Sequence, residues 1–151
     1  MPMPWTYRLA TREWQAFLAD ARDEMGLTSD NATFTAVEGV LRAFRARLTA
    51  QQAIDFAQIL PSVLRALFVA HWKIAPPLPA GTRADWTAEA MALRPHHNLT
   101  PDHCVTATAI ALRKAVLRSD LDRVLSDLPA FAADFWSTPG RDPSSIGPRI
   151  V

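Results

Sequence analysis

The stretch Arg47-Leu-Thr-Ala-Gln-Gln-Ala-Ile-Asp-Phe-Ala-Gln-Ile-Leu-Pro61 contains a helix start, a short helix and a helix stop. Thr49 and Gln52 have the spacing of a capping box, in which each side chain accepts a hydrogen bond from the backbone amide of the other residue. The buried side of this helix is expected to carry Ile54, Phe56 or Ala57, and Leu60. Pro61 cannot continue the helix because its ring clashes with the preceding turn, but it can occupy the first position of a new helix.

Apolar residues on both sides of this stretch recur at the spacing of an amphipathic helix. The three stripes are Trp14, Phe17, Leu18, Ala21 and Met25; Phe34, Val37, Val40, Leu41, Phe44 and Leu48; and Val63, Leu64, Leu67, Phe68 and His71. Thr11 and Thr28 are the expected N-caps of the first two helices, and Gly26 is the expected end of the first. No segment alternates with a period of two or carries an Asn-Gly or Asp-Gly hairpin signal, so an all-α fold is predicted.

The Pro-rich segment 73–82 predicts a stiff connector, and landmarks of the first half recur after it. At an offset of 72 residues the recurring landmarks are Trp14 and Trp86, Leu27-Thr28 and Leu99-Thr100, and Asp30 and Asp102. Leu60-Pro61 recurs as Leu128-Pro129 at an offset of 68, so four residues are expected to be lost near 117–120. Thr100-Pro101 is the expected start of the long helix in the second half.

These landmarks predict two pseudo-symmetric four-helix repeats packed into one helical bundle. The expected organisation of the single domain, residues 1–151, is repeat one over about 11–72, the connector over 73–82, a degenerate repeat two over about 83–136 and a loose tail over 137–151. Either repeat alone would bury a core that is marginal for its length, so the two apolar faces are expected to pack together. Duplication also predicts similar surroundings for Trp14 and Trp86.

Three segments of the first half carry a family resemblance: Gly26-Leu27 with Ala36-Val-Glu-Gly-Val-Leu-Arg42, Arg47-Leu-Thr-Ala-Gln-Gln-Ala53 with Asp55-Phe-Ala-Gln-Ile-Leu-Pro61, and Leu64-Arg65 before Trp72. They resemble the bacterial domain-of-unknown-function family 2267, whose pattern here is an Arg-Leu-Ser/Thr helix start, then Asp-Leu-Ala, Leu-Pro and a helix that ends near Gly-Trp. The resemblance is clear over 14–72 and faint over 82–136; the chain departs from it with His71 where the family tends to have Gly, and with a second half that lacks Asp-Leu-Ala. It implies an all-helical, often duplicated fold and transfers no catalytic residues.

The charge balance argues against nucleic acid or an acidic membrane surface as a partner, because sixteen basic and fifteen acidic residues leave a formal charge of only +1. The one basic concentration is Arg42, Arg45 and Arg47, with Arg65, and its spacing favours a solvated face over a nucleic-acid site. No apolar run reaches the ~18 residues that a membrane helix needs. The N-terminal residues lack the pattern of a signal peptide, so a cytoplasmic protein is predicted.

Chemistry-bearing side chains are most concentrated between Arg94 and Cys104. His96, His97 and His103, with Cys104, are candidate ligands for zinc or another borderline metal. Adjacent histidines tend to point apart, and no His-x-x-x-His or Cys-x-x-Cys spacing occurs, so a solvated loop followed by a buried helical cysteine is the favoured interpretation. The sequence predicts no catalytic residue, no cofactor and no internal disulfide. A small metal-binding protein or metal-dependent enzyme is the alternative function.

The sequence therefore predicts a non-enzymatic helical protein that acts as a protein-interaction or self-association module. Large aromatic residues near the ends of the repeats are the expected anchors, since such side chains tend to dominate interface energies. The candidate contact residues are Trp5, Tyr7, His71, Trp72 and Trp136. A place in the core is the alternative interpretation for some of these aromatic residues. His71 also belongs to an apolar stripe, so a partly buried histidine that donates to a carbonyl is its alternative interpretation.

Overall fold

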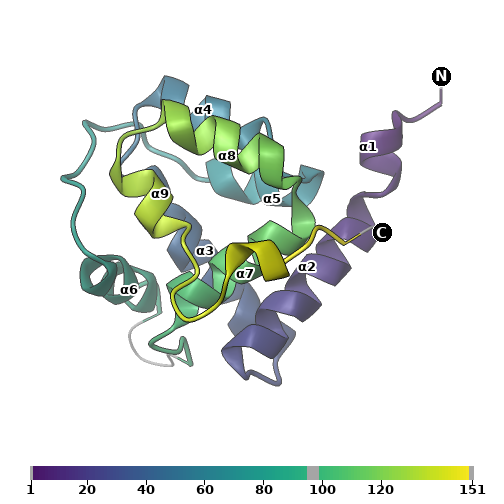
Figure 1. Cartoon of the computed structure of the whole chain (residues 1–151), viewed down its shortest axis with the longest axis horizontal. Coiled ribbons are helices and arrows are strands. Elements are labelled where there is room, and N and C mark those ends of the chain that lie inside the picture. Colours follow the sequence, from purple (N-terminus) through teal and green to yellow (C-terminus); the bar gives the residue numbers. More distant parts are fainter. Residues whose placement is uncertain (1, 95–98, 150–151) are drawn as a thin grey trace.

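The structure is a computed structural model that describes residues 2–94 and 99–149. Within these ranges the chain is helical and contains no strand (Figure 1), which confirms the all-α prediction. The elements are α1 (Trp5–Arg8), α2 (Ala10–Met25), α3 (Asp30–Arg45), α4 (Ala50–Ala57), α5 (Ser62–Val69), α6 (Arg83–Met91), α7 (Cys104–Ala115), α8 (Arg118–Asp127), α9 (Phe131–Phe135) and a short 3₁₀ helix, η1 (Pro143–Ser145). None of these described helices combines the length and the apolar character that spanning a membrane requires.

Local capping explains several helix boundaries in the first half. The Thr49 hydroxyl accepts from the Gln52 amide at 3.2 Å, and the Gln52 side-chain oxygen accepts from the Thr49 amide at 2.9 Å, so the predicted capping box of α4 is confirmed. Gly26 ends α2 as predicted, with φ 69°, in the left-handed region where a residue without Cβ meets no penalty. Ser29, rather than the predicted Thr28, caps α3, because its hydroxyl accepts from the amide three residues later at 3.2 Å.

Three other helix starts differ from the sequence predictions. α2 begins at Ala10, one residue before the predicted cap Thr11, and no side chain caps it. Pro61 precedes α5 as its N-cap instead of occupying the first helical position; the fixed φ of proline is compatible with both places, so the sequence does not separate them. α7 begins only at Cys104, because a separate turn comes before it, in which the Cys104 amide donates to the Pro101 carbonyl at 3.1 Å.

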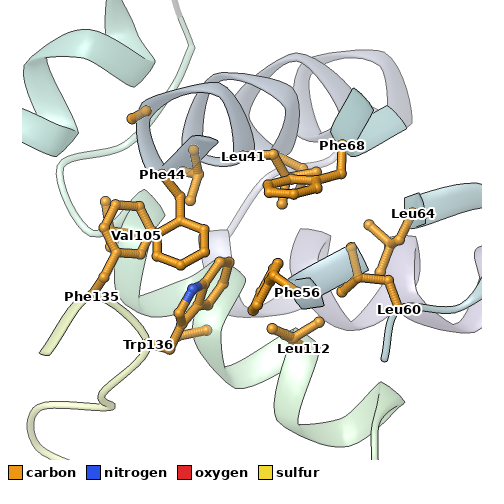
Figure 2. Packing of buried hydrophobic residues seen from close by; sticks show 14 of the residues in the cluster. Leu41, Phe44, Phe56, Leu60, Leu64, Phe68, Val105, Leu112, Phe135 and Trp136 are labelled. Carbon is orange, nitrogen blue, oxygen red and sulfur yellow. The ribbon is translucent and has the colours of Figure 1, made fainter. Parts of the chain in front are cut away.

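One aromatic cluster joins the two halves of the chain (Figure 2). Phe44 of α3 lies at its centre, with ring centroids 4.8 Å from Phe56, 4.9 Å from Phe135 and 5.3 Å from Trp136. Burial of each such side chain stabilises the fold by about 1.5–3 kcal/mol. Because Phe56 comes from α4 and the other two residues come from the end of the second half, both halves contribute to the same core.

Helices of the first half pack mainly against helices of the second half. α2 makes its most extensive contacts with α7, and α3 makes its most extensive contacts with α6. α4 and α8 also lie side by side in Figure 1. The connector between α5 and α6 is held to the end of α3, where the Leu78 amide donates to the Ala46 carbonyl at 2.9 Å and Arg47 donates to the Ala80 carbonyl at 2.9 Å. This anchoring fixes the path from one half to the other.

The predicted apolar stripe is confirmed for Leu64, Leu67 and Phe68, but its extension to His71 is wrong. α5 ends at Val69, and His71 lies beyond it with φ 55° and an exposed side chain. The helix ends here because the Arg45 guanidinium donates to the carbonyls of Phe68 at 3.0 Å and Ala70 at 3.1 Å. These bonds satisfy carbonyl groups at the end of α5 that would otherwise need a further helical turn.

Ile54 was expected in the core, but it is 44% exposed. The buried face of the short α4 consists of Ala53, Phe56 and Ala57. Phe56 fills the contact with the aromatic cluster, so Ile54 is left on the opposite, solvent-facing side.

Trp14 and Trp86, which were predicted to be equivalent, have different surroundings. Trp14 is half-buried, and its ring packs edge-on against Phe34 with centroids 6.0 Å apart. Trp86 is fully buried, donates from Nε1 to the Ala80 carbonyl at 2.8 Å and lies 4.6 Å from the ring of Phe135. The pairing of these two tryptophans at an offset of 72 residues is therefore wrong.

Residues 137–149 are docked on the helices, which corrects the predicted loose tail. Arg141 donates to both carboxylate oxygens of Glu24, at 2.7 and 3.2 Å, and these bonds hold the pKa of Glu24 below its ordinary value. Arg149 donates to Asp20 at 2.6 Å. The arginines that suggested a solvated tail thus find carboxylate partners on α2.

Candidate functional site

A surface cleft of about 1020 Å³ lies between elements of the two halves. Its walls come from α1 and the first half of α2, from the corner between α4 and α5, and from the segment that runs from the end of α7 through α8. Its apolar lining includes Trp5, Leu9, Phe17, Ile59, Leu60, Val116, Leu117, Val124 and Leu128. Small-molecule pockets typically have volumes of about 300–1,000 Å³. The cleft is therefore large enough for part of a helix as well as for a small molecule.

The basic side chains of the cleft all have partners within the described residues. The three ion pairs are Lys114–Glu24 at 3.7 Å, Arg123–Asp120 at 3.2 Å and Arg149–Asp20 at 2.6 Å. Arg65 instead donates to the carbonyls of Ala57, Gln58 and Leu60, where it caps the end of α4. The basic side chains of the cleft are therefore already paired with carboxylates or carbonyls of the same chain.

Three carboxylates that line the cleft form no ion pair in the part of the chain that the structure describes. They are Glu13 on α2, Asp55 on α4 and Asp127 at the end of α8. The Asp55 carboxylate accepts a hydrogen bond from the side-chain amide of Gln51, at 2.9 Å. The cleft therefore combines apolar walls with unpaired negative charge on three different helices, and this combination is complementary to a ligand that is apolar and cationic.

Two of the predicted contact residues stand exposed on α1, beside the cleft. The side chain of Trp5 is 67% exposed and that of Tyr7 is 51% exposed. The Arg8 guanidinium lies 5.5 Å from the centroid of the Trp5 ring, a cation–π contact. α1 is also fixed to the body of the protein, because the Ser62 hydroxyl donates to the Thr6 carbonyl at 3.3 Å.

The other predicted contact residues have different environments. Trp136 has no exposed surface and belongs to the aromatic cluster, so its prediction as a surface anchor is wrong. Trp72 is half-buried and lies 5.5 Å from the Arg45 guanidinium. His71 is exposed beside it. Among these residues Trp5 lines the cleft, and Tyr7 is exposed on the same helix without lining it.

The candidate metal ligands that the structure describes, His103 and Cys104, do not form a metal site. His96 and His97 lie outside the described residues. His103 uses its Nε2–H to donate to the Glu24 carbonyl at 2.9 Å. Cys104 is fully buried, and burial raises the pKa of its thiol to about 11. A neutral, inaccessible thiol is a poor nucleophile and a poor metal ligand. In residues 2–94 and 99–149 no group of three or more His, Cys, Asp and Glu side chains is placed to hold a metal ion.

The predicted basic face is also absent in the expected form. Arg45 and Arg47 are buried. Arg47 donates to the carbonyls of Ala43 and Ala80 and to both carboxylate oxygens of Glu89. These guanidiniums hold helix ends and the connector, so they are not available as a solvated face for phosphate.

Sequence reasoning missed the unpaired carboxylates, because Glu13, Asp55 and Asp127 are far apart in the chain and each looks like an ordinary surface acid. The signal that was available is a local one. Residues 2–12 contain two arginines, two aromatic residues and no acidic residue. That composition marks α1 and its flanks as cationic and apolar at once.

A protein-family model matches most of the chain. The model of a family described as "Uncharacterized conserved protein (DUF2267)" matches residues 14–135. The match confirms the resemblance inferred from the first half and extends through α9. No curated protein matches the chain.

Proposed function

This chain belongs to the DUF2267 family of uncharacterized conserved proteins, and from that premise we propose that it acts by binding another protein or a second copy of itself. The observation that carries this proposal is the uncovered aromatic surface of α1 beside a large cleft. Trp and Tyr are enriched among the residues that dominate interface energies. Their rigid side chains lose little conformational freedom on binding.

The position of α1 also supports binding. A flexible terminal segment would have to be ordered at a cost when it met a partner. Here the hydrogen bond from Ser62 to Thr6 sets the orientation of α1 before binding, and the contacts of α1 with α2 fix it further. The helix therefore presents Trp5 and Tyr7 in a preorganised arrangement.

A site-specific cross-link tests this function. With a photoreactive phenylalanine analogue in place of Tyr7, illumination of the producing cells is expected to give a covalent adduct with a partner chain. The same analogue in place of Ala88, an exposed residue of α6 outside the cleft, is the matched control and should give none. Trp5→Ala should remove the adduct at position 7, because it removes the neighbouring anchor. Equal labelling at both positions, or no adduct at position 7, would contradict the proposal.

We also propose that the chain is a duplicated four-helix unit, in a register that differs from the tryptophan landmarks. Two arginines, the buried Arg45 and the half-buried Arg113, bind equivalent carbonyls at the same offset of 68 residues. Arg45 donates to the Phe68 carbonyl at 3.0 Å, and Arg113 donates to the Trp136 carbonyl at 3.1 and 2.8 Å. Burial lowers the pKa of both guanidiniums. Each thus closes the last helix of its half from the end of the preceding long helix.

Helix lengths and packing also support a duplication. α3 has 16 residues and α7 has 12, so the four missing residues fit α7 better than the segment 117–120. The fully buried pair Phe17 and Ala21 on α2 has the spacing of Trp86 and Ala90 on α6, at an offset of 69 residues. Exchange of the two halves also turns the contact of α2 with α7 into that of α6 with α3.

Duplication predicts equal roles for the two arginines. Arg45→Met and Arg113→Met are each expected to lower the free energy of unfolding by about 2 kcal/mol, the cost of charged hydrogen bonds lost to buried carbonyls. Urea unfolding followed by circular dichroism measures both. Arg118→Met, at an exposed residue whose ion pair spans one helical turn, is the control and should change stability by less than about 0.5 kcal/mol. A large decrease in the free energy of unfolding for one of these two variants and none for the other would contradict the equivalence of Arg45 and Arg113.

A further inference from the structure

We propose that the partner covering α1 is a second copy of this chain, with α1 of each copy seated in the cleft of the other. This inference rests on the proposed binding function and names its partner. The two surfaces that it joins are the exposed face of α1 with the first turn of α2, and the cleft between α2, α4 and α8.

The first surface is cationic and aromatic. It carries Trp5 and Tyr7, which are exposed, together with Arg8 and Arg12. Neither arginine forms an ion pair with any described residue. No acidic residue occurs between positions 2 and 12, and Glu13, in the first turn of α2, forms no ion pair with Arg8 or Arg12.

The second surface is apolar and anionic. Leu117, which is exposed, and the neighbouring apolar residues provide the walls of the cleft. Glu13, Asp55 and Asp127 provide carboxylates that form no ion pair with any described residue. The unpaired charges of the chain around this site are therefore positive on α1 and negative in the cleft, and this complementarity favours another copy over an acidic partner.

The size of the cleft suits this occupant. A helix with its side chains is about 10–12 Å wide, so a cleft of about 1020 Å³ accepts about two helical turns. α1 itself has four residues, about one turn, so it fills the cleft only together with the residues on either side of it. The chain's own α1 does not fill the cleft, because it stands out from the body of the molecule and forms one edge of the cleft through Trp5, Thr6 and Leu9 (Figure 1).

A two-fold axis beside α1 accounts for both contacts at once. In a symmetric dimer the same surface is used by both copies, so α1 of one copy enters the cleft of the other and the reverse contact forms automatically. Because α1 borders its own cleft, the two reciprocal contacts are adjacent and form one continuous interface. A standard interface takes about 800 Å² from each partner, about a tenth of the 8188 Å² surface of this chain.

The first measurement is the mass in solution. Light scattering at chain concentrations of about 100 μM, above the micromolar dissociation constants of weak interfaces, is expected to give twice the chain mass of 16.7 kDa. Trp5→Ala with Tyr7→Ala is expected to give the monomer mass. Salt is expected to weaken the dimer, because the charge pairs at the interface are partly exposed and screened.

Charge reversal separates this arrangement from other dimers. One variant carries Arg8→Glu and Arg12→Glu, and a second carries Asp55→Lys and Asp127→Lys. Each alone is expected to be monomeric, since like charges then face each other in both contacts. An equimolar mixture is expected to form a heterodimer, because the two reversed surfaces then meet in one contact and the two unchanged surfaces meet in the other, so opposite charges face each other in both.

The matched control for the Arg8 and Arg12 variant is Lys73→Glu with Arg94→Glu. It makes the same change in net charge at exposed residues outside the cleft. It should leave the dimer intact. A wild-type monomer at all concentrations, a dimer that survives reversal of Arg8 and Arg12, or a mixture that stays monomeric would each overturn the inference. A cross-link from position 7 to a different protein, with the wild type monomeric, would overturn the choice of partner and leave the binding function standing. Absence of both dimer and cross-link would remove both proposals.

Discussion

Arg47→Met is expected to lower the free energy of unfolding by about 3 kcal/mol, because it removes a buried cation from a hydrogen-bond network that joins α3, the connector and α6. The side chain of Arg47 is only 5% exposed. Its guanidinium donates to the carbonyls of Ala43 and Ala80 and to both carboxylate oxygens of Glu89. Methionine retains the apolar stem, so the loss reports on the hydrogen bonds rather than on a cavity. Urea unfolding followed by circular dichroism measures it.

Two controls identify the source of the effect. Arg22→Met removes an ion pair with Asp30 in which both side chains are substantially exposed, and it should cost less than about 1 kcal/mol. Glu89→Gln retains an acceptor for Arg47 at a position where the carboxylate is 37% exposed, so it should cost about 1 kcal/mol or less. If Arg47→Met costs no more than Arg22→Met, the buried network does not hold the connector.

Features set by neighbouring residues were predictable from the sequence. The capping box of Thr49 and Gln52 and the left-handed end of α2 at Gly26 both follow from bonds within one turn. The overall helical content follows from the 3.6-residue period for the same reason. These features need no information about what packs against them.

Features set by distant residues were not predictable. Whether α5 continues to His71 depends on Arg45, 23 residues before the Phe68 carbonyl that it binds. Whether residues 137–149 are loose depends on Glu24 and Asp20, more than 100 residues away. A local pattern cannot reveal which distant side chain satisfies a given carbonyl or carboxylate.

The candidate site also depends on residues that are distant in the sequence. The cleft takes its walls from α2, α4 and α8, which the sequence separates by a connector and several helices. Trp5 and Tyr7 were identified because their residue type is informative in any position. Trp136 was misplaced by the same rule, since the preference of large aromatics for interfaces does not distinguish an interface from a core.

Gly39→Ala is expected to destabilise the protein by about 2 kcal/mol, although the same change in an exposed helix would stabilise it by about 1 kcal/mol through helix propensity. A Cβ at position 39 would lie 2.5 Å from the carbonyl oxygen and 2.9 Å from the Cα of Ala90. These are backbone atoms of α6, so they cannot rotate away as a side chain can. α3 and α6 must therefore move apart, and this contact is the most extensive one that α3 makes.

The identity of the clashing atoms gives the decisive test. Ala90→Gly removes only a methyl group, whereas the oxygen, Cα and carbonyl carbon that meet the new Cβ all remain. The double variant should therefore be no more stable than Gly39→Ala alone. Gly147→Ala, where nothing lies within 4 Å of the added Cβ, is the control and should change stability by less than about 0.5 kcal/mol. Rescue by Ala90→Gly would mean that side-chain packing, not the approach of two backbones, sets the distance between α3 and α6.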